Sequence, residues 1–478
     1  MCGIAGFCNF KEDFEENTDY WNFRLEKMRA VLAHRGNDAR GRYLKKHIGL
    51  SHSRLAIRDI LCGDQPMTRT HNGYEYTICY NGEIYNTDEL IPELSENGFV
   101  CSTTSDTEVI LYAYIHWGAD FVNRLNGIFA FAIWDAAKSR LLLYRDRVGV
   151  KPLFYAIRGD SLVFGSEPKA CFAHPAVKPE LDKQGLQELL AIGPAHTSGL
   201  SLFKDLFEVL PGHFMIYSQD GLHDETYWEL TSREHTESYR DTVAHTRFLV
   251  EDAIKRQMVS DVPVCTFLSG GIDSSIVTAI AANYMNTRGK TLNTFSFDFK
   301  DNDRYFKANA FQPERDLPYV NRMLEEYETA HSYLECDENS LFKALFAAVD
   351  AKDMPGMTDV DSSLLYFCSL VSRKNKVALT GECADEIFGG YPWFYRKELL
   401  ERYGFPWSSD VAPRLALLRD DVGFELDLSG YQAFRYEESR SKAPLLYGEA
   451  GEDESRRIIG YLNIKWFMQT LLDRMDRT

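Results

Sequence analysis

The chain has 478 residues, which is too many for one hydrophobic core and predicts two or three domains. Its 71 acidic and 53 basic residues give a formal net charge of −18, which argues against broad contact with nucleic acid or an anionic membrane. The ten cysteines form no CxxC pair, and we find neither a signal peptide nor an apolar run of about 18 residues, so we expect a reduced cytoplasmic compartment.

The chain begins Met1-Cys2-Gly3, so removal of Met1 would leave a thiol and a free α-amine on the same residue. With ordinary pKa values of about 8 for the amine and about 8.5 for the thiol, the neutral amine can accept the thiol proton. The alternative interpretation is a buried cysteine at the start of a strand, because free cysteine often acts as a small hydrophobe.

Short apolar runs separated by turn residues predict stacked antiparallel sheets in the first half of the chain. We expect strands at residues 49–57, 76–80, 128–134, 140–145, 161–164 and 214–217, the last being the final strand of this half. Helical periodicity at residues 21–33 and 107–117 predicts helices that cover those sheets. The polar residues 231–238 are expected to connect this half to the next.

The second half alternates single strands with long helices, which predicts a parallel sheet with helices on both faces. Strands are expected at residues 262–268, 291–299 and 376–380, with a helix at residues 274–284 after the first strand. Ligands of such sheets bind at the carboxyl ends of the strands. The residues that follow these strands are therefore candidates for a binding site.

A glycine-rich turn, SGGIDSS at residues 269–275, follows the first of these strands. Glycine lets the backbone approach a phosphate closely, and the next helix offers unpaired N–H groups at its start. The alternative is a tight turn capped by serine. The carboxylate of Asp273 within the turn favours an anion held together with Mg²⁺.

A second polar cluster follows the third strand and contains Glu382, Asp385 and Glu386. Three carboxylates this close repel one another unless a cation or a proton-transfer role holds them there. The alternative is a solvated helix start, where acidic side chains are favourable. The apolar residues and glycines that follow, at 387–390, argue against full solvation.

Together these segments resemble the glutamine-dependent asparagine synthetase family, and the resemblance extends from Cys2 to the final residues. The matching segments of the first half are residues 1–7, 34–36, 53–57, 81–86, 105–108, 145–153 and 166–170. The resemblance implies an α+β glutaminase domain at residues 2–230, a class II glutamine amidotransferase with an N-terminal-nucleophile (Ntn) αββα sandwich of antiparallel sheets. It also implies an α/β parallel-sheet ATP-pyrophosphatase domain, similar to the adenine nucleotide alpha hydrolases, at residues 239–478.

For the first domain, the resemblance implies that Cys2 attacks the side-chain amide of glutamine, with its own α-amine as base. Asn81 and Gly82 would form the oxyanion hole, although Asn-Gly alone would indicate a hairpin turn. Arg54 would hold the glutamine carboxylate, although it could instead pair with an acidic neighbour. The residues implied to contact the rest of the substrate are Glu83 and Asp106, facing its α-ammonium, with Leu55 and Ile57 near them.

For the second domain, the family implies ATP and Mg²⁺ as cofactors. Glu382 would be the base when ammonia attacks the activated acyl group. Asp273 and Asp385 would bind the metal. The residues implied to bind the nucleotide are Phe267, Leu268, Ser269, Gly270, Gly271, Asp273, Ser274, Ser275, Phe297, Thr380 and Gly381.

The implied enzyme is an ATP-dependent carbon-nitrogen ligase, a glutamine-hydrolysing asparagine synthetase. Ammonia released at Cys2 would reach a second site and amidate an AMP-activated aspartate, with release of AMP and pyrophosphate. One alternative is an amidotransferase acting on another carboxylate, such as a peptide, an antibiotic or a cell-envelope precursor. A further alternative is a glutaminase or regulatory relative without ligase activity. The partners would be small molecules, with no nucleic acid or membrane, and dimerisation is common in the family.

Three departures from the family pattern stand out. Asn37 replaces a common proline, a change we expect the turn to tolerate. Cys383 replaces a common glycine and would be strained if that position needs a positive φ. The sequence ends at Thr478, where relatives continue into a segment with a phosphate-contacting lysine, so we expect a fragment or an altered ligase half. Residues 301–315 look specific to this chain, either as a lid or as a plain surface loop.

Overall fold

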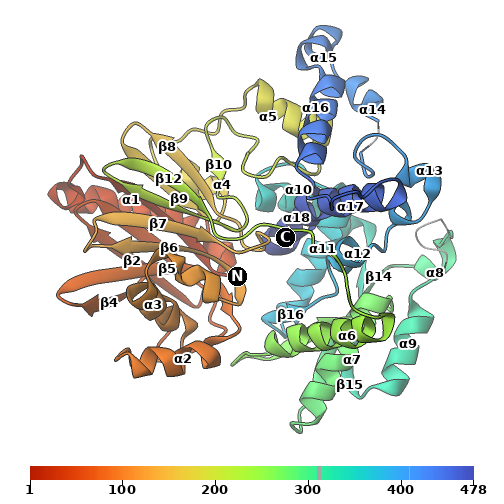
Figure 1. The fold of residues 1–478 in the computed structure, drawn as a ribbon, viewed down its shortest axis with the longest axis horizontal. Coiled ribbons are helices and arrows are strands. Elements are labelled where there is room, and N and C mark those ends of the chain that lie inside the picture. The colour runs from red at the N-terminus through yellow and green to blue at the C-terminus, as the bar shows by residue number, and fades with distance from the viewer. Residues whose placement is uncertain (309–313, 409) are drawn as a thin grey trace. The chain divides into compact units, whose positions relative to one another are not determined.

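The computed structural model describes residues 1–308, 314–408 and 410–478. The chain forms two compact units, one of Met1–Ser232 with Tyr391–Arg477 and the other of Arg233–Gly390. Figure 1 labels most of their helices and strands. All ten cysteines are free thiols. No helix in the described part of the chain is long and apolar enough to cross a membrane.

Two antiparallel sheets of six strands each form the middle of the first unit. The first sheet, in spatial order, contains β10 (Phe207–Glu208), β8 (Phe154–Arg158), β9 (Ser161–Gly165), β1 (Gly3–Asn9), β3 (Ile48–Arg54) and β2 (Ala39–Lys45). The second contains β12 (Gly221–Thr226), β11 (His213–Ser218), β7 (Arg140–Arg145), β6 (Gly127–Asp135), β5 (Tyr74–Ile84) and β4 (Met67–His71). β1 and β3 are buried along their whole lengths because other layers cover both of their faces.

Helices cover the outer face of each sheet. α1 (Thr18–Ala30) and α4 (Pro168–Phe172) share a core with the first sheet, and α2 (Thr87–Glu96) and α3 (Asp106–Trp117) share one with the second. A third core lies between the sheets, where Ile4 and Leu50 pack in one cluster with Ala132 and Leu143. The four layers confirm the predicted αββα sandwich.

Helices from the end of the chain complete the first unit. Ala191 and Ile192, which follow α5 (Lys183–Gln187), share a buried cluster with Leu428, Leu462 and Trp466. These C-terminal helices are α13 (Lys397–Leu400), α14 (Ala412–Leu415), α15 (Asp420–Leu426), α16 (Leu428–Ser441), α17 (Glu452–Leu462) and α18 (Met468–Arg477). Residues more than two hundred positions apart in sequence therefore form one core.

The second unit contains a parallel sheet of four strands in the order β15 (Thr329–Cys336), β14 (Leu292–Phe299), β13 (Val264–Phe267) and β16 (Val377–Leu379). Ala281 and Ala282 of α7 (Ile272–Asn286) pack on one face of the sheet, and Phe367 of α11 (Thr358–Val371) packs on the other. The other helices of this unit are α6 (Tyr239–Arg256), α8 (Asn302–Tyr305), α9 (Leu317–Glu326), α10 (Glu338–Lys352) and α12 (Ala384–Phe388). The predicted parallel sheet with helices on both faces is confirmed.

Seven strands lie outside the predicted set, namely β1, β2, β4, β8, β10, β12 and β15. The expectation that residues 214–217 form the last strand of the first half is wrong, because β12 follows and pairs with β11 at the sheet edge. β15 is likewise an edge strand, with polar and apolar residues that show no clear alternation. Edge strands with an exposed side need few apolar residues, so the apolar patterns gave no sign of them. Part of the segment 301–315, residues 309–313, lies outside the described residues.

Candidate functional site

The thiol of Cys2 lies at the start of β1 and against the end of β3. Its Sγ is 3.4 Å from the backbone N of Leu55, which donates to it, and 3.6 Å from the Leu55 carbonyl oxygen. Burial raises the pKa of this thiol above its usual value, while nearby positive charges act in the opposite direction. A thiol with a raised pKa needs a base to become a nucleophile.

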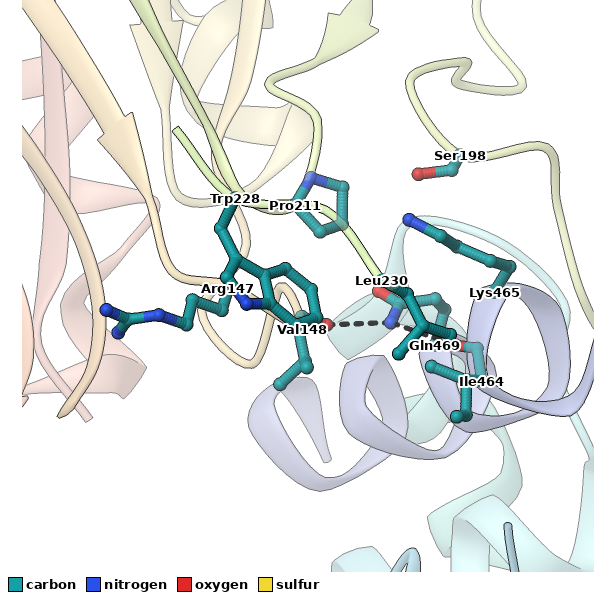
Figure 2. Close-up of a pocket in the computed structure, with 9 residues that line it drawn as sticks. All are labelled: Arg147, Val148, Ser198, Pro211, Trp228, Leu230, Ile464, Lys465 and Gln469. Atoms are coloured by element: carbon teal, nitrogen blue, oxygen red, sulfur yellow. Dashed lines mark hydrogen bonds between the residues drawn. The ribbon is translucent and has the colours of Figure 1, made fainter. Parts of the chain in front are cut away.

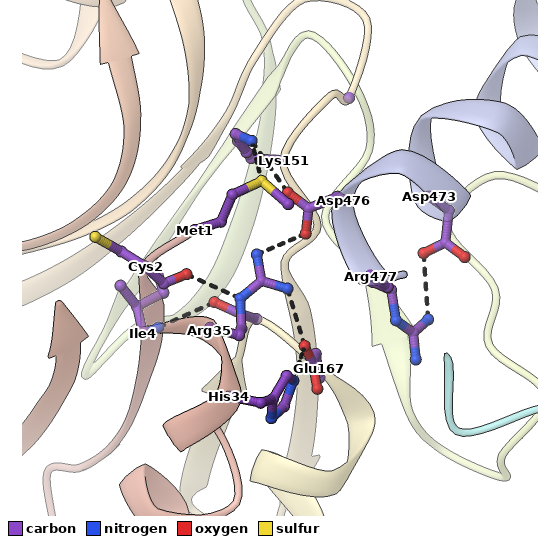
Figure 3. Close-up of polar contacts among 12 residues, drawn as sticks. Met1, Cys2, Ile4, His34, Arg35, Lys151, Glu167, Asp473, Asp476 and Arg477 are labelled. Atoms are coloured by element: carbon purple, nitrogen blue, oxygen red, sulfur yellow. Dashed lines mark hydrogen bonds and ion pairs between the residues drawn. The ribbon is translucent and has the colours of Figure 1, made fainter. Parts of the chain in front are cut away.

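Met1, beside Cys2, is partly buried as well. Burial, followed by the charge of Arg35, lowers the pKa of the Met1 amine to about 5. The Nε of Arg35 donates to the carbonyl oxygen of Cys2 at 2.8 Å, as Figure 3 shows. An amine in this environment is neutral at neutral pH and can accept a proton.

Asn81 and Gly82 lie within β5, and Gly82 is in register with Phe129 of β6. The hairpin interpretation of this Asn-Gly pair is therefore wrong. A Cβ at Gly82 would come within 2.2 Å of the carbonyl oxygen of Ile128, so no larger residue fits without a shift. The Nδ2 of buried Asn81 has no hydrogen-bond partner among the residues that the structure describes. A buried donor without a partner is costly unless a ligand supplies the acceptor.

β5 passes close to the thiol at this point. The charge of Cys2 contributes to the pKa of Cys79 and of Glu83, which flank Asn81 and Gly82 on the strand. The nucleophile candidate and the predicted oxyanion donors thus belong to one region.

Two carboxyl groups lie in the same region, that of buried Asp106 and that of half-buried Glu83. Asp106, the first residue of α3, accepts from the hydroxyl of Tyr80 at 2.9 Å and from the backbone N of Ile84 at 3.0 Å. Burial raises the pKa of Asp106, and burial with the charge of Asp106 raises that of Glu83 well above its usual value. A bound cation would relieve the repulsion of this pair.

Arg54 is buried, and its guanidinium contacts the loop that follows it. It donates to the carbonyl oxygens of Asp59 at 2.5 Å and Ile60 at 3.2 Å, and to the carboxylate of Asp64 at 3.1 Å. Asp64 is the acidic neighbour that the alternative interpretation required. Because its side chain is 77% exposed, a substrate carboxylate could replace it without leaving a buried charge. Ile57, half-buried, lies on the same loop.

In the second unit, the glycine-rich turn joins β13 to α7. Gly270 has φ of +87°, and a Cβ there would meet the carbonyl oxygen of Asp316 at 2.8 Å, so only glycine fits easily. The hydroxyl of Ser274 accepts from the backbone N of Ser269 at 3.2 Å, which holds the turn closed. The backbone N of Ser275 donates to the carbonyl of Gly271, the N-cap of α7, at 3.0 Å. This arrangement leaves the first N–H groups of a 15-residue helix facing a turn of small residues.

The three apolar residues predicted near adenine belong largely to the core. The rings of Phe267 and Phe297 lie 4.6 and 5.2 Å from that of Phe367. Leu268 is buried, and its carbonyl oxygen accepts from the hydroxyl of Ser296 at 2.5 Å. Any contact of Phe267 or Phe297 with a nucleotide would involve backbone or ring edges.

Asp273 and Asp385 come together although 112 positions separate them. Burial and then the charge of Asp385 raise the pKa of Asp273. Gly381 makes this approach possible, since a Cβ there would lie 2.8 Å from the Asp273 Cβ. Two carboxylates that repel each other beside a phosphate-type turn fit a Mg²⁺ ion, whose preferred ligands are oxygens.

Cys383 has a φ of +71°, so the predicted strain at this position is confirmed. It is the N-cap residue of α12 and follows Glu382, whose backbone N donates to the hydroxyl of Thr380 at 3.4 Å. The left-handed region costs a residue with a Cβ free energy that glycine does not pay.

We expect Cys383→Gly to have a free energy of unfolding about 1 kcal/mol higher than Cys383→Ala, because glycine adopts this φ without strain. Urea unfolding of the two variants measures the difference. The same pair at Cys336, a buried position without positive φ, is the control, and there alanine should be the more stable. A more stable alanine at both positions would show that Cys383 is not strained.

A small cavity in the first unit lies away from Cys2. It has a volume of about 10 Å³ and is lined by Trp228, Val148, Lys465, Gln469 and neighbouring residues (Figure 2). The Nε2 of Gln469 donates to the carbonyl of Val148 at 2.7 Å across it. Burial lowers the pKa of Lys465. Such a cavity has room for about one water molecule and not for glutamine.

Sequence patterns did not identify the polar cluster that contacts the carbonyl group of Cys2. Arg35 and Glu167 both lie in segments that match the family, but no pattern indicated that they pair with each other. Asp476, which also contacts Arg35, lies near the other end of the chain. The signals in the sequence were the presence of Arg35 in the segment 34–36 and of Glu167 in the segment 166–170.

Comparison with known proteins agrees with both parts of the chain. Residues 1–228 match the family model described as a glutamine amidotransferase domain, and residues 245–478 match the one described as asparagine synthase. A glutamine-hydrolysing asparagine synthetase of Bacillus subtilis, number 3, is 48% identical over 478 residues, which are all of this chain and 77% of that protein.

Less similar relatives include proteins named as asparagine synthetases and proteins named as amidases. Asparagine synthetase 1 of B. subtilis is 32% identical over 84% of this chain and 60% of its own length. The amidase chyE of Penicillium rubens is 31% identical over 86% of this chain and 62% of its own length. With two domain matches in order and the full-length identity to the first relative, the chain belongs to the family of glutamine-hydrolysing asparagine synthetases.

Proposed function

We propose that this protein hydrolyses glutamine at Cys2 and transfers the ammonia to an aspartate that ATP has activated, giving asparagine, AMP and pyrophosphate. The observation that carries the first step is the partly buried thiol of Cys2 beside a strand whose Asn81 Nδ2 has no acceptor among the residues that the structure describes. The domains would be residues 2–230 for glutamine hydrolysis and 239–478 for synthesis. We propose that the protein works in the cytoplasm. We also propose that it forms a homodimer, and light scattering of the purified chain would test this.

In the first step, removal of Met1 would free the α-amine of Cys2 in a buried environment near Arg35. The amine would take the thiol proton, and the thiolate would attack the amide carbon of glutamine. The Asn81 side chain and the Gly82 N–H would stabilise the oxygen that becomes negative. Return of the proton to the leaving nitrogen releases ammonia, and water then hydrolyses the thioester to glutamate.

Arg54 would bind the α-carboxylate of glutamine by giving up its contact with exposed Asp64. Glu83 and Asp106 would bind the α-ammonium group between them. Leu55 and Ile57 would contact the substrate through their backbone. The site would thus recognise both charged groups of an amino acid, which separates glutamine from simple amides.

Glutamine binding should release a proton, because burial and the charge of Asp106 raise the pKa of Glu83 and so favour its protonated form, which a bound ammonium would disfavour. Affinity should therefore rise with pH up to the pKa of Glu83 in the free protein and level off above it. The groups that act on Glu83 are Asp106, Arg58, Cys2 and Lys151. Calorimetry of Cys2→Ala in buffers of different ionisation enthalpy measures the proton release, and adding Glu83→Gln should abolish it. Equal proton release with and without Glu83 would contradict this assignment.

In the second unit, Ser269, Gly270, Gly271, Ser274 and Ser275 would bind the pyrophosphate of ATP through the turn and the start of α7. Asp273 and Asp385 would hold Mg²⁺, which would neutralise phosphate charge during adenylation. Phe267, Leu268, Phe297, Thr380 and Gly381 would contact the nucleoside. Glu382 would accept a proton as ammonia attacks the acyl group.

Aspartate is our proposed acceptor, and the similarity to an amidase favours testing other carboxylates too. Protein with Met1 removed is incubated with glutamine, Mg-ATP and a panel of carboxylates while glutamate and pyrophosphate are measured. We expect aspartate to give pyrophosphate and AMP. If another carboxylate gives pyrophosphate and aspartate does not, that carboxylate is the acceptor. Glutamate release without pyrophosphate would indicate a glutaminase only.

A further inference from the structure

The carbonyl group of Cys2 is held by a buried guanidinium that has three separate partners. Arg35 donates from Nε to the Cys2 carbonyl oxygen at 2.8 Å, from Nη1 to Glu167 at 2.9 Å and from Nη2 to Asp476 at 2.5 Å. Figure 3 shows these three contacts. Each partner binds a different nitrogen of the planar guanidinium. The position of Nε beside the Cys2 carbonyl therefore depends on the contacts with Glu167 and Asp476.

Asp476 belongs to α18, at the far end of the chain, yet both of its carboxylate oxygens are used in this cluster. Oδ2 accepts from Arg35, and Oδ1 accepts from Lys151 at 3.1 Å. The side chains of Asp476 and Arg35 are 1% and 2% exposed. Although burial alone would raise it, the charges of Arg35 and Lys151 lower the pKa of Asp476.

Loss of this carboxylate would leave two buried cations facing each other with one acceptor fewer. A buried charge without its partner is strongly unfavourable, so Arg35 would turn toward Glu167 or water. Such a turn moves Nε away from the Cys2 carbonyl. A shift of about 1 Å at a reacting atom can cost about 10²-fold in rate.

We propose that Asp476 is a positioning residue for glutamine hydrolysis, acting through Arg35 on the backbone of Cys2. This inference rests on the proposed role of Cys2 as the nucleophile. It makes the packing of α18, a helix within the segment that matches asparagine synthase, a condition for an active nucleophile. The state of that segment could thereby control glutamine hydrolysis.

The test compares Asp476→Asn with Asp473→Asn on the same helix. Asp473 accepts from Arg477 at 3.2 Å and is the control for the loss of an aspartate charge from α18. In Asp476→Asn we expect kcat for glutamine hydrolysis to fall about 10- to 100-fold. KM should stay within about twofold, because the groups that would bind glutamine are untouched. Asp473→Asn should keep both values within about twofold.

The pH dependence of Cys2 alkylation by iodoacetamide separates positioning from general loss of stability. Asp476→Asn should shift this profile, whereas Asp473→Asn should not, even if both lower the melting temperature equally. If Asp476→Asn does not fold, Asp476→Glu carries the test, since it keeps the charge and displaces the carboxylate. An unchanged kcat in the folded variant would overturn the proposal. No glutamine hydrolysis by the unmodified protein would instead contradict the proposed function.

Discussion

Replacement of Cys2 by alanine should reduce glutamine hydrolysis by at least about 10³-fold, because the variant has no nucleophile for the amide carbon. Synthesis with added ammonia should stay within about twofold, since that reaction does not use the thiol. The measurement is the initial rate of asparagine formation with each nitrogen donor, at saturating Mg-ATP and aspartate.

The matched control for this variant is Cys62→Ala, which removes an exposed thiol from the same unit. It should leave both nitrogen sources active. Loss of both activities in Cys2→Ala, with the fold intact, would contradict two separable reactions. Mass spectrometry of the N-terminus is a companion test, because retained Met1 would block the α-amine that the mechanism requires.

Replacement of Asp273 by asparagine should lower pyrophosphate release by about 10²-fold or more and raise the Mg²⁺ concentration needed for half-maximal rate. Asp273 and Asp385 lie close enough for one to raise the pKa of the other, which is the arrangement that a divalent cation stabilises. Glutamine hydrolysis should be little affected. The measurement is the rate of pyrophosphate release across a Mg²⁺ titration.

Asp337→Asn is the control for the loss of one aspartate from the second unit. Its carboxylate caps α10 by accepting from the backbone N of Ser340 at 2.7 Å. This is a structural role, unlike the metal-binding role proposed for Asp273. This variant should keep the Mg²⁺ dependence unchanged. An Asp273→Asn protein with unaltered Mg²⁺ dependence would remove Asp273 from the metal site.

Local patterns in the sequence predicted nine of the sixteen described strands, mainly those that carry continuous apolar runs. β7 was predicted with its observed ends, and α3 to within one residue. The edge strands β2, β4, β10, β12 and β15 were missed because edge strands need few apolar residues, and the interior strands β1 and β8 were missed as well. The packing of α16 and α17 with Ala191 and Ile192 depends on contacts between distant segments, which no local pattern reports.

The candidate site likewise contains residues that the sequence predicted and residues that only the structure shows. Asn81 and Gly82 were recognised as a pair, but only the pairing of β5 with β6 shows that they lie in a strand. The positive φ of Cys383 followed from its replacing a family glycine. By contrast, Asp476 reaches Arg35 across 441 positions, and an aspartate in a charged helix end looks like an ordinary surface residue in the sequence.

The most direct test of the proposed coupling follows the nitrogen itself. Protein with Met1 removed is incubated with glutamine labelled with ¹⁵N in its amide, together with Mg-ATP and aspartate, in excess unlabelled ammonium at low pH. We predict asparagine that carries ¹⁵N, formed with equal amounts of AMP and pyrophosphate. Labelled ammonia in solution, with no labelled amide and no pyrophosphate, would contradict the account.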